Sequence, residues 1–261
     1  MYEPDESPLL NLWREQMGDR ERVPLHEEER FPRLLEAFMP PGFGMYVEPG
    51  SELVREGAGV RLSLSARLQP SAFMPFEQLS LQQTGPLQRS FSTQERAAHH
   101  KIMRLPENWT DQGRGRAVVM ESARLYRDIG ITTVTLNAVD TGRYAWAMCG
   151  FDFADDKNRD YVMNRVQVFA NEVLDIGLDL GELQYPWEIA AIEGEVTLAE
   201  IAAAGGEEIE LPGLLQAKMD APMRLGKALM LFSDISGWEG VLDLRDEAPG
   251  YQQLVNYTVP E

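Results

Sequence analysis

Apolar and polar residues alternate along residues 59–68, and this pattern predicts a half-buried strand. Val60, Leu62, Leu64 and Ala66 occupy every second position. In an extended chain such residues share one face, because successive side chains point to opposite sides. One face of this strand is therefore expected to lie on a hydrophobic core.

Residues 87–91 and 97–105 predict two further strands, and the β-branched segment 131–138 predicts a fourth. A helical pattern covers about residues 117–128, and Gly130 follows it as a helix stop. The order strand, helix, strand is typical of α/β proteins, in which a crossover helix packs on a sheet.

The remaining elements are shorter. The pattern predicts a short helix at 141–149, an extended segment at 151–153, and helices at about 155–175 and 197–204. The last of these helices begins with a Thr-x-x-Glu capping box. Residues 225–232 fit either a buried helix or a buried strand.

We expect three segments: an N-terminal helical and loop segment (1–58), an α/β domain (59–154) and a C-terminal extension (155–261) that its acidic charge sets apart. The extension carries 21 acidic and 7 basic side chains, a net charge of -14 out of -18 for the whole chain. So negative a protein is expected not to bind nucleic acid, because phosphates would be repelled.

The location is predicted from what the sequence lacks. No apolar run approaches the ~18–20 residues of a membrane span, and the acidic N-terminus is unlike a signal peptide. Cys149 is the single cysteine, so an intrachain disulfide is excluded, and the residue is expected to be buried. These features predict a cytoplasmic protein that does not bind membranes.

Residues 112–117, Gln-Gly-Arg-Gly-Arg-Ala, are the clearest candidate for a binding site. A glycine-rich turn that enters a helix presents backbone N–H groups to an anion. Residues 101–127 hold six basic and three acidic side chains within an acidic protein. The pattern predicts a phosphate-bearing ligand. The alternative is that these charges form an ordinary solvated helix face.

The same segment resembles the GNAT acyl-CoA N-acyltransferases. Gln112-x-x-Gly115-x-Ala117 fits the family signature, and a strand carrying Asn137, a short helix and the pair Gly150-Phe151 follow in the family's order. The resemblance covers about residues 59–153. It implies a GNAT-like mixed central sheet flanked by helices, here with an acidic C-terminal α+β extension.

The resemblance also implies a ligand and a reaction. Acetyl-CoA, or another acyl-CoA, would be the co-substrate, and the acyl group would pass to the amine of a small molecule or peptide. The strand around Met103 and Leu105 would pair with the pantetheine arm. The other implied cofactor-binding residues are Gln112, Gly113, Arg114, Gly115, Arg116, Ala117 and Asn137.

Two residues are candidates for proton transfer. Glu107 follows the central strand and is a candidate base acting through water; the alternative is a solvated loop carboxylate. Many GNAT enzymes have a tyrosine four residues before the glycine of Gly-Phe, but Trp146 occupies that position here. Tyr144 is the nearest candidate acid, and the alternative for it is simple packing against Trp146.

Three further expectations concern partners and metals. His99 and His100 face opposite sides of a strand, with either a structural or a basic role, and no spaced ligand set predicts a metal. A GNAT-like domain without catalysis, acting in assembly, for example in a virion, or as a CoA sensor, is the alternative function. The acidic extension would then be a surface for a homo-oligomer or assembly partner, or would attract a cationic amine.

Overall fold

The computed structural model describes residues 7–27, 38–39, 44–69, 84–105, 113–175, 196–204, 208–209 and 223–257. The chain has a mixed α/β fold and divides into two compact units. The first contains residues 1–136, 243–251 and 258–261, and the second contains residues 137–242 and 252–257. The division into segments 1–58, 59–154 and 155–261 stays a prediction.

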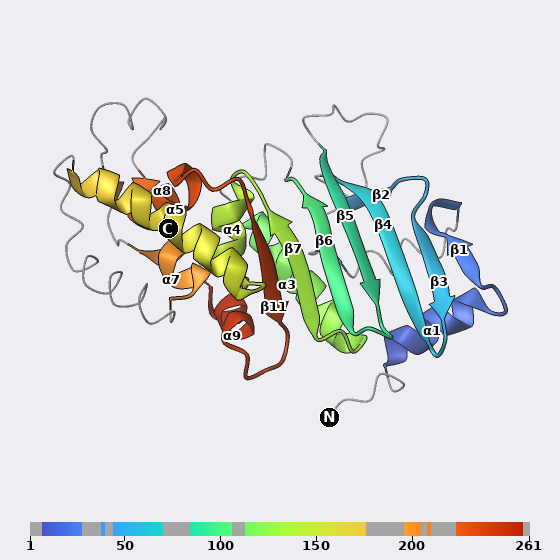
Figure 1. The fold of residues 1–261 in the computed structure, drawn as a ribbon. Helices are drawn as coiled ribbons and strands as arrows, with labels where there is room; N and C mark the ends of the chain where they lie inside the picture. Colours follow the sequence, from blue (N-terminus) through green and yellow to red (C-terminus); the bar gives the residue numbers. More distant parts are fainter. Residues whose placement is uncertain are drawn as a thin grey trace. The chain divides into compact units, whose positions relative to one another are not determined.

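The first unit is built on a mixed sheet with the strand order β1-β3-β4-β5-β6-β7 (Figure 1). Strand β2 pairs with β4, beside β3. All neighbours are antiparallel except β6 and β7, which are parallel because helix α3 crosses over between them. The strands are β1 (Arg22–Pro24), β2 (Gly44–Val47), β3 (Glu52–Glu56), β4 (Gly59–Gln69), β5 (Gly85–Ser92), β6 (Ala97–Met103) and β7 (Thr133–Ala138).

Two helices of this unit, α1 (Pro8–Met17) and α3 (Arg114–Asp128), cover one face of the sheet (Figure 1). Trp13 of α1 stacks on Phe91 of β5, with ring centroids 5.7 Å apart. Tyr126 of α3 meets the same ring edge-on at 6.1 Å. Aromatic rings therefore join both helices to the middle of the sheet. A 3-10 helix, η2 (Leu25–Glu27), follows β1.

Strand β6 contains a β-bulge. Gln88 of β5 pairs with Ile102, but the next residue, Arg89, pairs with His100. Lys101 is therefore the extra residue on β6. The parallel pairing of β6 with β7 runs from Ala97 to His100 of β6, whereas β6 itself continues to Met103.

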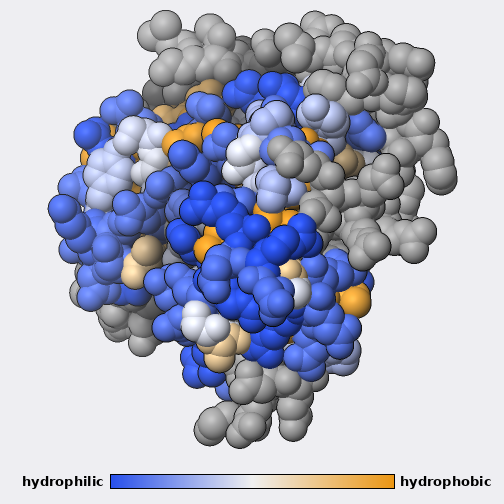
Figure 2. Space-filling view, turned by 90° about the vertical axis from the view of Figure 1, so that its right-hand side faces the viewer, coloured by the Kyte–Doolittle hydropathy of each residue, from blue (hydrophilic) through white to orange (hydrophobic). Residues whose placement is uncertain are grey.

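The edge of the sheet at β1 is short and polar. Arg22 on this strand forms an ion pair of 3.2 Å with Glu52, and Pro24 ends the strand. Figure 2 shows that this side of the molecule is mainly hydrophilic, with scattered apolar residues. Short charged strands that contain proline resist edge-to-edge pairing with another chain.

The second unit combines helices with two antiparallel strand pairs. Strand β8 (Asp152–Phe153) pairs antiparallel with β11 (Trp238–Asp243), and β9 (Glu208–Ile209) pairs antiparallel with β10 (Met223–Arg224). The helices are α4 (Gly142–Met148), α5 (Asp156–Asp175), α7 (Leu198–Ala203) and α8 (Leu225–Phe232), and α9 (Pro249–Asn256) begins in the first unit and ends in the second.

Most predicted elements lie where the sequence pattern put them. Residues 225–232 form a helix, and the capping box of α7 is present, with Thr197 and Glu200 bonded reciprocally. Helix α3 begins at Arg114, three residues earlier than predicted, because Gly113 already serves as its N-cap. The hydrophobic pattern gave no sign of strands β1, β2 and β3 or of helix α9.

Candidate functional site

Helix α3 begins directly after a glycine in the left-handed conformation. Gly113 has φ 66° and ψ 2°, which a residue with a Cβ adopts only with strain. The first hydrogen bond of the helix runs from the Ala117 amide to the Gly113 carbonyl, at 3.1 Å. The amides ahead of this bond point out of the helix end, where an anion would be favoured.

The first turn of α3 carries two arginines. No side chain caps it and no acidic residue lies in it, as is also true of α4 and α8, whereas Ser7 caps α1 and Thr197 caps α7. Its charged residues are Arg114 and Arg116, and both are half-buried. Because the helix dipole is positive here, arginines oppose it unless an anion is nearby. A helix terminus that carries positive charge favours a negatively charged group beside it.

The structure brings the predicted residues Leu105 and Gly115 together. A Cβ added to Gly115 would lie 3.0 Å from a Leu105 methyl carbon, so the segment after β6 rests on the first turn of α3. Met103, two residues before Leu105, pairs with Leu87 of β5. The end of β6 and the start of α3 therefore form one continuous surface.

The other predicted site residues belong to the second unit or fall outside the described residues. Glu107 and Gln112 fall outside the described residues. Asn137 is exposed on β7, and Tyr144 is half-buried on α4; both belong to the second unit, whereas the start of α3 belongs to the first. The residues brought together by the structure are those of β6 and α3.

The aromatic residues of α4 have separate environments. Trp146 is buried and meets Phe151 edge-on at 5.3 Å, so its indole packs in the interior. Tyr144 lies beside Lys227, whose Nζ is 6.0 Å from the ring centroid. Burial raises the pKa of the Tyr144 phenol, although the Arg224 cation lowers it. Tyr144 therefore holds its proton at neutral pH, as a general acid must.

A second tyrosine of this unit was not singled out by the sequence. The phenol oxygen of Tyr161 on α5 lies 3.1 Å from the Ser236 hydroxyl and accepts a hydrogen bond of 3.2 Å from the Ser236 amide. Hydrogen bonding by Ser236 lowers the pKa of this exposed phenol, with a smaller contribution from the Arg165 cation. The contact between Tyr161 and Ser236 joins residues far apart in the sequence, so the sequence pattern alone does not predict it.

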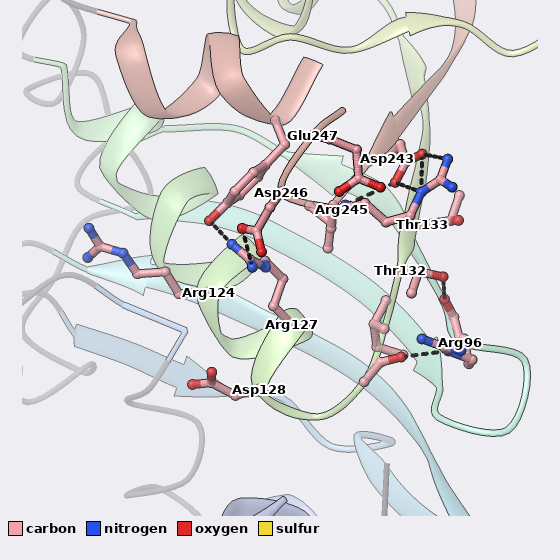
Figure 3. Close-up of a pocket in the computed structure, with 14 residues that line it drawn as sticks. Arg96, Arg124, Arg127, Asp128, Thr132, Thr133, Asp243, Arg245, Asp246 and Glu247 are labelled. Atoms are coloured by element: carbon pink, nitrogen blue, oxygen red, sulfur yellow. Dashed lines mark hydrogen bonds and ion pairs between the residues drawn. The ribbon is translucent and has the colours of Figure 1, made fainter. Parts of the chain in front are cut away.

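A pocket of about 1030 Å³ lies at the opposite end of α3 (Figure 3). Four arginines and four acidic side chains line it, so their charges balance. Arg127 donates to Asp246 at 2.5 Å and also to the Tyr251 hydroxyl, and Arg245 is paired with Asp243. These guanidinium groups already have acceptors, so the pocket shows no preference for an anion.

Beneath β5 and β6 lies a buried polar cluster. Arg89 is 3% exposed and donates to the Ser122 hydroxyl, while its Nη2 lies 3.5 Å from the Met103 sulfur. The Nε2 of His100 lies 3.0 Å from the Tyr126 hydroxyl. Burial lowers the pKa of His100 well below its ordinary value, and the charges of Arg89 and His99 lower it further. The sequence pattern did not predict this cluster.

The adjacent histidines face opposite sides of β6, as predicted. His99 is half-buried and its Nδ1 lies 3.0 Å from the Thr135 hydroxyl, whereas His100 is buried. Cys149 is buried, as predicted. Among the described residues, no three His, Cys, Asp or Glu side chains gather to hold a metal ion. None of the described helices is long and apolar enough to span a membrane.

Comparison of the chain with protein-family models, with curated proteins and with solved structures gives no match. What can be said of the site therefore comes from its own residues and geometry.

Proposed function

We propose that this chain is an acyl-CoA-dependent N-acyltransferase that transfers an acyl group, such as acetyl, to an amine. The first turn of α3 is the observation that carries the proposal. It follows a left-handed glycine, has no side-chain cap or acidic residue, and carries two arginines. These features suit the pyrophosphate of CoA, which would accept hydrogen bonds from the turn's amides and charge-assisted bonds from Arg114 and Arg116.

The end of β6 is the proposed binding position of the pantetheine arm. The pairing with β7 stops at His100, while β6 continues to Met103. Backbone groups of β6 beyond the paired part would bond the amides of the pantetheine arm. Leu105, in contact with Gly115, would then lie between the pantetheine arm and the pyrophosphate.

The chemical step needs a base and an acid. An acceptor ammonium group loses one proton to the base, and the free amine attacks the thioester carbonyl. The C–S bond breaks, the attacking nitrogen loses a second proton to become an amide nitrogen, and the thiolate takes up a proton from the acid. Tyr144 keeps its phenol proton and is the proposed acid, and Glu107 remains the proposed base. The acceptor is a small-molecule or peptide amine, for which the acidic residues of 155–261 provide general electrostatic attraction.

Isothermal titration with acetyl-CoA tests the binding step. The wild type is expected to bind, and Gly115→Trp is expected to abolish binding, because an indole at this position would displace Leu105 and fill the first turn. Gly115→Ala is the matched control, since its Cβ would meet only the flexible end of Leu105. Absence of heat with the wild type at millimolar acetyl-CoA would rule the function out.

The second candidate is a GNAT-like domain that binds without catalysis and acts in assembly. Trp146 favours it, because the indole at the tyrosine position of the family packs on Phe151. Release of free CoA in the presence of polyamines, aminoglycosides and lysine peptides distinguishes the two. Turnover that Tyr144→Phe reduces supports the enzyme, whereas binding without turnover supports the assembly function.

A further inference from the structure

Arg89 is a buried cation that forms no ion pair with any acidic residue in the described part of the chain. It lies on β5 opposite His100 of β6, and it is 3% exposed. Its Nη1 donates to the hydroxyl of Ser122, and its Nη2 reaches the sulfur of Met103 at 3.5 Å. Its Nε has no hydrogen-bond acceptor among the described residues.

The groups around Arg89 are neutral. Tyr126 bonds it, but burial raises the pKa of that phenol, so the hydroxyl keeps its proton. His100 is neutral for the reason given above. The Ser122 hydroxyl donates a hydrogen bond to the Val118 carbonyl, at 2.6 Å, and is uncharged. None of the ion pairs formed by the described residues includes Arg89.

Such an arrangement is unfavourable unless a negative charge joins it. A buried charge is ordinarily paired, and an unpaired one is strongly destabilising. A guanidinium has five donors in a fixed fork that matches a carboxylate. The thioether of Met103 is a weak acceptor, so a carboxylate oxygen in its place would satisfy Arg89 far better.

Met103 also connects Arg89 with the proposed acyl-CoA site. It is half-buried at the end of β6, on the strand proposed to pair with pantetheine. Methionine side chains are unbranched and adapt easily to a neighbouring group. Access to the Arg89 guanidinium from the end of β6 would require Met103 to rotate away from it, since the Met103 sulfur lies 3.5 Å from Nη2.

We infer that Arg89 binds the terminal carboxylate of the transferred acyl group, so that the preferred donor is a dicarboxylic acyl-CoA. This inference rests on the proposed function. It names the class of acyl group, which the first turn of α3 does not determine because that turn would bind only the CoA part.

Succinyl-CoA and butyryl-CoA form the decisive pair of probes, since their acyl chains have four carbons and differ in the terminal carboxylate. Titration of the wild type is expected to give at least about tenfold tighter binding of succinyl-CoA, because hydrogen bonds to charged groups are worth roughly that much. Arg89→Met, of similar length and without charge, is expected to remove the preference. Arg89→Lys is expected to retain part of it.

Arg67→Met is the matched control. Arg67 lies on β4 of the same sheet and pairs with Glu48 at 2.9 Å. This variant loses the same charge and is expected to keep the preference. The wild-type comparison stands even where Arg89→Met does not fold.

Each other outcome has a distinct meaning. Binding of neither acyl-CoA would overturn the proposed function and this inference with it. Equal binding of both by the wild type would overturn the role of Arg89 alone, as would a preference that survives in folded Arg89→Met. Free succinate that binds as tightly as succinyl-CoA would assign Arg89 to an independent anion and overturn the acyl-group assignment.

Discussion

The two ends of helix α3 carry the same kind of side chain in opposite electrostatic settings. Arg114 and Arg116 lie at the N-terminal end, where the helix dipole disfavours positive charge, and no acidic residue shares their turn. Arg124 and Arg127 lie toward the C-terminal end, where the dipole favours them, and Glu121 and Asp246 pair with them. The second arrangement pairs the arginines with carboxylates of the protein, whereas the first carries the positive charge on which the proposed anion site rests.

Removing the arginines from each end gives the largest expected contrast. The double variant R114A/R116A should weaken acetyl-CoA binding by about 100-fold or more, because each charge-assisted bond is worth roughly 1.5–3 kcal/mol. The double variant R124A/R127A should leave the affinity within about twofold, since these groups are engaged with protein carboxylates. Titration calorimetry of both variants measures the contrast. Equal losses at both ends would contradict it.

The middle of α3 should make stability depend on pH. His100 contacts Tyr126 of this helix, and its pKa in the folded protein is well below the unfolded value of about 6.5. The unfolded chain therefore binds a proton that the folded chain does not. Stability should fall as the pH drops below about 6.5, by up to roughly 1.4 kcal/mol per pH unit.

Urea unfolding between pH 7.5 and pH 5 tests this dependence, with the variant His100→Gln as the comparison. Burial lowers the pKa of His100 most, the charges of Arg89 and of the neighbouring His99 lower it further, and the Tyr126 hydroxyl bonds the ring. The variant should lose the part of the slope that belongs to His100. A wild-type slope identical to that of the variant would show that folding does not lower the pKa of His100, contrary to the expectation.

A glycine with positive φ lies at each end of the helix. Substituting each one distinguishes an effect on stability from an effect on acetyl-CoA binding. Gly113 has φ 66° and Gly130 has φ 81°. Substitution of either by alanine should lower the free energy of unfolding by about 1–2 kcal/mol, since a Cβ disfavours this conformation. Thermal unfolding should show similar losses. Gly113→Ala alone should also weaken acetyl-CoA binding, and a binding loss in Gly130→Ala would blur the distinction between the two ends.

The smallest expected effect is at the C-terminal end. Arg127→Ala should cost about 0.5–1 kcal/mol, because its ion pair with Asp246 is largely exposed. The loss should shrink in high salt, where surface charges are screened. Chemical unfolding at two salt concentrations measures it. A salt-independent loss would assign the effect instead to the contact of Arg127 with the Tyr251 ring, whose centroid lies 4.5 Å away.

The regular elements of the sheet could be predicted because each has its own period. Strand β4 alternates over a full face, and α3 has an apolar side that ends before a glycine. The N-terminal strands β1, β2 and β3 have three to five residues each, too few for alternation to stand out. They are strands because β3 and β4 offer partners, which is a property of the assembled sheet.

The candidate site likewise contains one part that the sequence predicts and one part that it does not. The glycine turn is visible in sequence because glycine and arginine alternate within six residues. Arg89 is not visible, because a single arginine between Gln88 and Ser90 resembles any solvent-exposed strand position. Only the packing of α3 on β5, with Ser122 above the guanidinium, shows that this charge is inside.

The bulge at Lys101 changes which residues of β6 share a face of the sheet. Pairing with β5 places His100 opposite Arg89 and Met103 opposite Leu87, so two residues three positions apart share a face. An unbroken strand would separate them, since its faces alternate strictly. The inserted residue Lys101 therefore shifts the alternation of side chains along β6. Before the bulge the even-numbered residues face the core, and after it the odd-numbered Met103 faces the core.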